Sequence, residues 1–111
     1  NFVNASVEGW YRYLNDPSEA NAVINTLDAN QTPEQLAFSF KEMTERGIVA
    51  SGDAMENGIG TMNDARWKAA SEQLKSIGLL SQDTDYTKAF TTEFVNSEHI
   101  KELMAKYPTA Q

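Results

Sequence analysis

The sequence predicts an all-α chain of five to six helices, organised as a single helical domain or segment over residues 1–111. Three observations favour this class. Apolar residues recur with the 3.6-residue period of an α-helix along most of the chain. Residues that cap or start helices, and glycines that end them, follow one another at short intervals. Strand character is confined to residues 90–95, so no sheet is expected.

The first half of the chain is expected to form three helices. The second of them begins at Asp16-Pro17, where Asp16 can cap free N–H groups, Pro17 suits the first helical position and Glu19 can reach back as in a capping box. Residues 32–35 (TPEQ) repeat this pattern, and Gly47 is placed to end the third helix in the left-handed conformation. The faces expected to be buried are Val3, Val7, Trp10, Tyr11 and Leu14; Ala20, Val23, Ile24 and Leu27; and Leu36, Phe40 and Met43.

The second half is expected to form two long helices and one short turn. Asn63 is a cap for the first of these helices, and Gly78 is its stop. Residues 86–90 suit a short helical turn, and Asn96 or Ser97 opens the last helix. The corresponding buried faces are Trp67, Ala70, Leu74 and Ile77, and then Ile100, Leu103, Met104 and Tyr107.

Composition excludes several classes of function. The net charge is −7, which argues against nucleic acid and against electrostatic docking on anionic lipid. Cysteine is absent, so disulfides and thiolate metal sites are impossible. No apolar run approaches the length of a membrane span. The chain does not begin with Met, and Asn1 leads directly into helical spacing, so we expect a processed or truncated chain with no signal peptide of its own.

Residues 52–67 (GDAMENGIGTMNDARW) concentrate glycines and acids, and they are best interpreted as a connector. Gly58-Ile59-Gly60 lacks the third glycine and the strand of a dinucleotide fingerprint, and no Gly-Lys-Ser/Thr is present for a P-loop. The acids do not follow the calcium-loop pattern, so no metal site is expected. Asp53 is expected to cap a turn at 54–57, with glycines that permit tight turns or close helix approach.

Neither catalysis nor a cofactor is expected. His99 is the only histidine and lies off the apolar face of the last helix, so it is interpreted as a solvated surface residue. A Ser–His–Asp arrangement stays open, but no Gly-x-Ser-x-Gly elbow marks a nucleophile. The aromatic residues could stack on a flat ligand, but their helical spacing favours packing. These aromatic residues are Trp10, Tyr11, Tyr13 and Trp67.

An ordered series of short segments resembles one protein family, the solute-binding proteins of ABC importers for nitrate, sulfonates and thiamine-pyrimidine precursors. The series covers nearly the whole chain and weakens after Asn96. Its segments are 2–14 (FVNASVEGWYRYL), 16–17 (DP), 47–49 (GIV), 51–54 (SGDA), 58–62 (GIGTM), 64–67 (DARW), 78–80 (GLL), 85–91 (DYTKAFT) and 94–95 (FV).

The resemblance implies the C-terminal helical part of a bilobed α/β type II periplasmic binding protein. Such a protein closes on a small solute and presents it to an ABC permease, in the periplasm or, lipid-anchored or secreted, outside the cell. Roughly the first two thirds of the family's length is not present in this chain. The connector could reach the cleft between the lobes, so the candidate ligand-binding residues are Asp53, Asn57, Gly58 and Met62, with shaping of the turn as their alternative role.

Two other functions stay open at this point. A free-standing interaction module would cover its apolar helix faces with a second copy of itself, as a homodimer. An enzyme is the weakest of the three hypotheses, because the residues that relatives of this family use to make the thiamine pyrimidine would lie outside this chain.

Overall fold

Helix α1 (Phe2–Asn15) is the central element of the computed structural model, which describes residues 2–108. Val7, Tyr11 and Leu14 recur on one face of this helix, and all three are buried. Trp10 lies at the edge of that face and stays 41% exposed, so the expectation that it is buried was wrong. Its ring instead packs edge-to-face on Tyr13, with centroids 6.1 Å apart.

The core lies where α1 packs on α6 (Ser97–Lys106), together with Ile59 from the segment that follows α4 (Asp53–Asn57). Asn96 caps α6 as expected, because its side-chain oxygen accepts hydrogen bonds from two backbone N–H groups of the first turn. Tyr11 is fully buried, and its hydroxyl accepts a hydrogen bond from the Ile59 backbone N–H at 3.0 Å. The buried cluster consists of Val7, Tyr11, Leu14, Ile59, Ile100 and Leu103.

Helices α2 (Ser18–Leu27) and α3 (Pro33–Glu45) pair as an antiparallel hairpin. The expected capping box begins α3, with Thr32 and Gln35 bonded reciprocally. At α2 the expectation was partly wrong. Pro17 is the N-cap residue and no capping box forms, although Asp16 does accept a hydrogen bond from the Ser18 N–H at 3.0 Å.

Helix α5 (Asp64–Ser76) folds back on the 3₁₀ helix η1 (Tyr86–Lys88), and both were expected near these positions. Asn63 caps α5 by accepting from the Ala65 N–H at 2.8 Å. Gly78 follows the helix with φ of 74°.

Two sets of burial expectations were wrong because, among residues 2–108, the packing of α2 on α3 and of α5 on η1 leaves most of the apolar side chains concerned exposed. On α5, Ser71 is the buried residue, whereas the apolar positions are exposed. On α2 no residue is buried. The exposed fractions are 53% for Val23, 36% for Ile24, 82% for Leu27, 36% for Trp67, 41% for Leu74 and 62% for Ile77.

The all-α prediction is confirmed for the described residues, which form six α-helices, one 3₁₀ helix and no strand. The strand character of residues 90–95 is therefore not realised. The segment turns locally instead, with the Val95 N–H donating to the Thr92 carbonyl at 3.1 Å. β-Propensity describes fit to a pleated surface, and no second strand is available here to make one.

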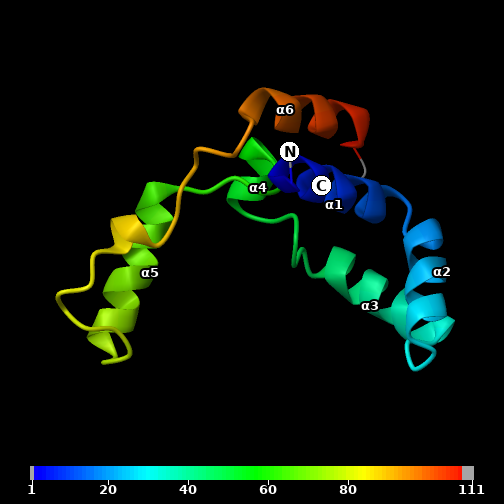
Figure 1. Ribbon diagram of the computed structural model, residues 1–111, viewed down its shortest axis with the longest axis horizontal. Helices are drawn as coiled ribbons and strands as arrows, with labels where there is room; N and C mark the ends of the chain where they lie inside the picture. Colours follow the sequence, from blue (N-terminus) through cyan, green and yellow to red (C-terminus); the bar gives the residue numbers. More distant parts are fainter. Residues whose placement is uncertain (1, 109–111) are drawn as a thin grey trace.

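The elements form an open arch (Figure 1), with the α2–α3 hairpin at one end, α5 and η1 at the other, and α1, α4 and α6 between them. The radius of gyration is 16.9 Å, against about 13 Å for a compact chain of this length. The surface area is 7961 Å², against roughly 6,100 Å² for a compact protein of this mass. The chain thus exposes about 1,900 Å² more than a compact monomer of this mass would.

Candidate functional site

The expected connector contains the short helix α4, held between glycines of unusual conformation. Gly52 is its N-cap with φ of 55°, and Gly58 is its C-cap with φ of 88°. Asp53 is the first residue of α4 and not its cap, so that expectation was wrong, whereas the turn expected at 54–57 is present. Both φ values lie where residues with a Cβ are strained, so the glycines fix the path of the connector.

A hollow opens beside α4, and three of the four predicted site residues line it. Its volume is about 480 Å³. An adjoining hollow of about 320 Å³ shares four lining residues with it and continues along α5. We call the two together the hinge hollow. The first is lined by Asp53, Glu56, Asn57, Thr61, Met62, Asn63, Ser97 and Lys101, and the second adds Arg66, Trp67 and Ala70.

The fourth predicted residue, Gly58, lies under the hollow against the core and does not line it. Its N–H donates to the Ala54 carbonyl at 3.0 Å, and its carbonyl accepts the Thr61 hydroxyl at 2.8 Å. A Cβ added at Gly58 would come 2.1 Å from the Ile100 Cγ2 and 2.9 Å from the Tyr11 hydroxyl. The residue therefore permits the close approach of the connector to α1 and α6, a role expected of glycine here.

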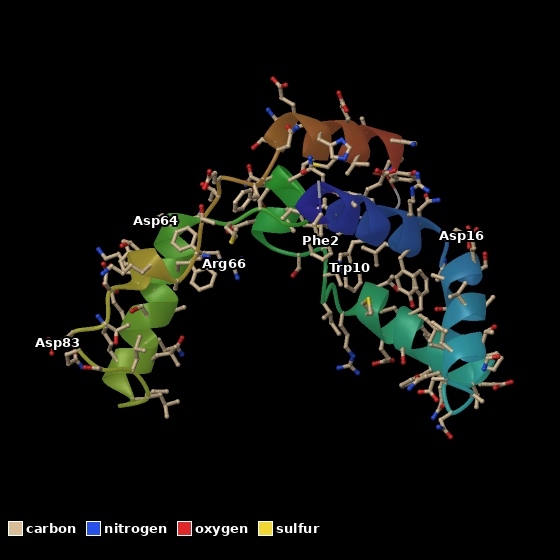
Figure 2. All side chains as sticks on the ribbon, viewed as in Figure 1. Phe2, Trp10, Asp16, Asp64, Arg66 and Asp83 are labelled. Atoms are coloured by element: carbon tan, nitrogen blue, oxygen red, sulfur yellow. The ribbon has the colours of Figure 1, made fainter. Side chains whose placement is uncertain are left out.

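Charges of both signs surround the hinge hollow. Asp53 and Glu56 come from α4, Lys101 from α6 and Arg66 from α5. The Arg66 guanidinium lies 3.5 Å from the Asp53 carboxylate, and both side chains are substantially exposed. In Figure 2, Asp64 and Arg66 lie at the end of α5 nearest the centre of the molecule, whereas Asp83 lies at the far tip. The hollow offers hydrogen-bonding groups to a small polar molecule, together with the apolar surface of Met62 and Trp67.

The aromatic residues of this region pack on one another. Trp67 and Phe90 are stacked with parallel rings, and their centroids are 5.1 Å apart. The Tyr86 hydroxyl donates to the Asp64 carboxylate at 3.3 Å. Partial burial is the main cause that raises the pKa of Tyr86, and the nearby Asp64 charge raises it further. Trp67 thus makes an aromatic packing contact, as expected, although it stays 36% exposed.

The single histidine lies near one carboxylate in the part of the chain that the structure describes. His99 is 29% exposed, and its Nδ1 lies 3.8 Å from the Glu102 carboxylate on the next turn of α6. Among residues 2–108, no three His, Cys, Asp or Glu side chains are grouped so that they could hold a metal ion.

Sequence reasoning missed the half of the hinge hollow that α6 and α5 supply. Ser97 and Lys101 follow the candidate residues by about forty positions, and only the packing of α6 on α4 brings them together. A signal was available for Arg66, because it belongs to the Asp64–Trp67 segment that carries the family resemblance. The place of Arg66 at the hollow was not predicted, because its pairing with Asp53 depends on how the connector folds.

Comparison with known proteins leaves the chain without an assigned relative, since no family model, no curated protein and no solved structure matches it. Over residues 2–108, no helix has both the length and the apolar character needed to cross a bilayer.

Proposed function

We propose that the chain is the C-terminal helical region of the solute-binding component of an ABC importer, of the kind that takes nitrate, sulfonates or pyrimidine-type molecules. The chain has no catalytic role in this proposal. The whole protein binds a small solute and delivers it to an ABC permease, in the periplasm or, lipid-anchored or secreted, outside the cell. The ordered series of segments from Phe2 to Val95 suggests the family.

The observation that carries the proposal is the set of exposed apolar side chains on, and just after, the regular helices α2 and α5. Leu27, at the end of α2, and Ile77 and Leu79, just after α5, are 62% to 82% exposed, although Leu27 and Ile77 continue the apolar periodicity of their helices. The surplus surface of about 1,900 Å² has the size of a large protein interface, counted on one partner. A helical segment that normally covers the lobes of a larger protein would have these properties.

The position of the hinge hollow also supports the proposal. Asp53, Asn57 and Met62 line a hollow that is partly open to solvent. One wall of a cleft, completed by a second body, would be open in this way. In the proposed whole protein these three side chains contribute to solute contact, and Gly58 supports them from below.

The test compares this chain with the longer polypeptide that its reading frame encodes. The absence of cysteine allows one thiol to be introduced at a time. Leu79→Cys should react with a maleimide at least tenfold more slowly in the longer protein, whereas Ser81→Cys, two residues away on the exposed loop, should react equally fast in both. Equilibrium dialysis of the longer protein with nitrate, a sulfonate and an aminopyrimidine should show one of them bound.

Two results would contradict the proposal. The first is a reading frame without two α/β lobes upstream of this segment. The second is a longer protein in which Leu79→Cys stays fully reactive and none of the three solute classes binds.

A second candidate function is a homodimeric interaction module, favoured by the same exposed faces on both ends of the arch. Two copies would each carry a net charge of −7, so their association should strengthen with added salt. Sedimentation velocity over a hundredfold range of concentration distinguishes the candidates. A discrete dimer formed by this chain alone supports the module, and a monomer at every concentration contradicts it.

A further inference from the structure

Residues 63–90, which we call the arm, are held together mainly by contacts within the arm. The Lys75 ammonium donates to the Thr84 carbonyl at 2.8 Å, and the Gln82 side chain donates to the Lys75 carbonyl at 3.2 Å. The stacked pair Trp67–Phe90 closes the other end of the arm. These contacts join α5, the loop after it and η1 into one unit.

The arm has little contact with the rest of the chain. Of the described residues, none between 60 and 94 belongs to the buried cluster or to the apolar side chains packed against it. The α2–α3 hairpin differs, because Phe40 and Met43 of α3 do pack on that cluster. The ion pair between Arg66 and Asp53, at 3.5 Å, is the side-chain bond that links the arm to α4, and it is exposed to solvent.

Two short connectors join the arm to the centre. The first is fixed at Gly60, where an added Cβ would come 2.7 Å from Val7, and it reaches the arm through residues 61–62. The second leaves the arm at residues 91–94 and is fixed again at Val95, which packs on the core. The hydrogen bonds of both connectors are local, from Thr61 to Gly58 and from Val95 to Thr92. Figure 1 shows the first connector running from α4 to α5 and the second from η1 to α6.

We infer that the arm is a separate rigid body that moves on a hinge formed by these two connectors, and that its motion opens and closes the hinge hollow. The hollow has walls from both bodies: Lys101 and Glu56 belong to the centre, whereas Arg66 and Trp67 belong to the arm. The Asp53–Arg66 pair crosses between the bodies and acts as a latch. The inference concerns this chain itself and holds whether or not it belongs to an importer.

The experiment measures distances between spin labels on the chain as it stands. Because there is no native cysteine, Ser81→Cys with Ala105→Cys reports the distance from the arm to the centre. Ala5→Cys with Ala105→Cys is the matched control within the centre, across the packed helices α1 and α6. Double electron–electron resonance should give a distribution at least twice as wide for the first pair as for the control. Equal, narrow widths would overturn the inference.

The latch is tested in the same labelled protein. Asp53→Asn should broaden or shift the distribution between arm and centre, and leave the control pair unchanged. Glu56→Gln removes an equal charge from the same helix but no bond to the arm, so it should leave both distributions unchanged. Equal effects of the two substitutions, or no effect of Asp53→Asn, would overturn the latch.

Discussion

Replacing Gly58 by alanine should be among the most destabilising single-methyl changes in this chain. The backbone there has φ of 88°, which costs a residue with a Cβ about 1–2 kcal/mol. The new methyl would also lie 2.1 Å from the Ile100 Cγ2 and 3.1 Å from the Met104 sulfur, and such overpacking costs about 1–3 kcal/mol more. The sum is about 2–5 kcal/mol, a large part of the roughly 5–15 kcal/mol that stabilises a typical domain.

Two other glycines separate the components of this loss. Gly78 has φ of 74° and no atom within 4 Å of an added Cβ, so Gly78→Ala should show the backbone strain alone. Gly9 lies inside α1 with the same open space, so Gly9→Ala should stabilise by roughly 0.5–1 kcal/mol through helix propensity.

The assay is urea denaturation followed by circular dichroism at 222 nm, with the free energy of unfolding extrapolated to water. The expected order of stability is Gly9→Ala, wild type, Gly78→Ala and Gly58→Ala, from highest to lowest. If Gly58→Ala costs no more than Gly78→Ala, the close approach of the connector to α6 is not present in solution, and the reasoning fails.

Three further predictions follow from buried or bonded groups. Tyr11→Phe should lower the free energy of unfolding by about 1–3 kcal/mol in the same denaturation assay, because the buried Ile59 N–H loses its acceptor. A loss below about 0.5 kcal/mol, roughly the resolution of such data, would contradict that bond. Ser71→Ala should raise stability by about 1–2 kcal/mol, because the Ser71 hydroxyl is buried without a partner and alanine favours helix; a loss would show that the hydroxyl is bonded. Hydrogen bonds from the Thr87 hydroxyl, which has the larger effect, and from the Thr87 backbone N–H lower the pKa of Asp85 below 3.8. The unfolded chain therefore takes up this proton first as pH falls, so the contribution of Asp85 to stability is present above about pH 4 and lost below it. Thermal unfolding between pH 2 and 6 should show a weaker acid dependence for Asp85→Asn, and an unchanged slope would refute the assignment.

The local signals in the sequence predicted helices well, because each depends on a few neighbouring residues. Asn63 and Asn96 cap the helices that follow them, and Thr32 forms its capping box with Gln35. Gly47 adopts φ of 57° at the end of α3 as expected. Hydrogen bonds over two or three positions decide these features, so a single sequence contains the information.

Burial could not be predicted in the same way, because it depends on what lies opposite a helix face. Leu14 and Leu27 occupy equivalent places on the apolar faces of their helices, yet the first is 7% exposed and the second 82%. Helix α6 packs on the face of α1, whereas the contact of α2 with α3 leaves Leu27 exposed. The same limit applies to the hinge hollow, where Asp53 was foreseen but Lys101 required the packing of α6 on α4.

The difference between local contacts at the two ends of the arch and distant contacts at its centre also determines the order in which the molecule can fold. The α2–α3 hairpin and the arm each join residues that are close in sequence, and such local contacts form quickly. The buried cluster instead brings Val7 against residues as distant as Ile100 and Leu103. During synthesis the two ends can therefore form before α6 has been made and can cover the apolar face of α1. In that interval the face is exposed to other chains, so aggregation on the way to the native state should begin at α1.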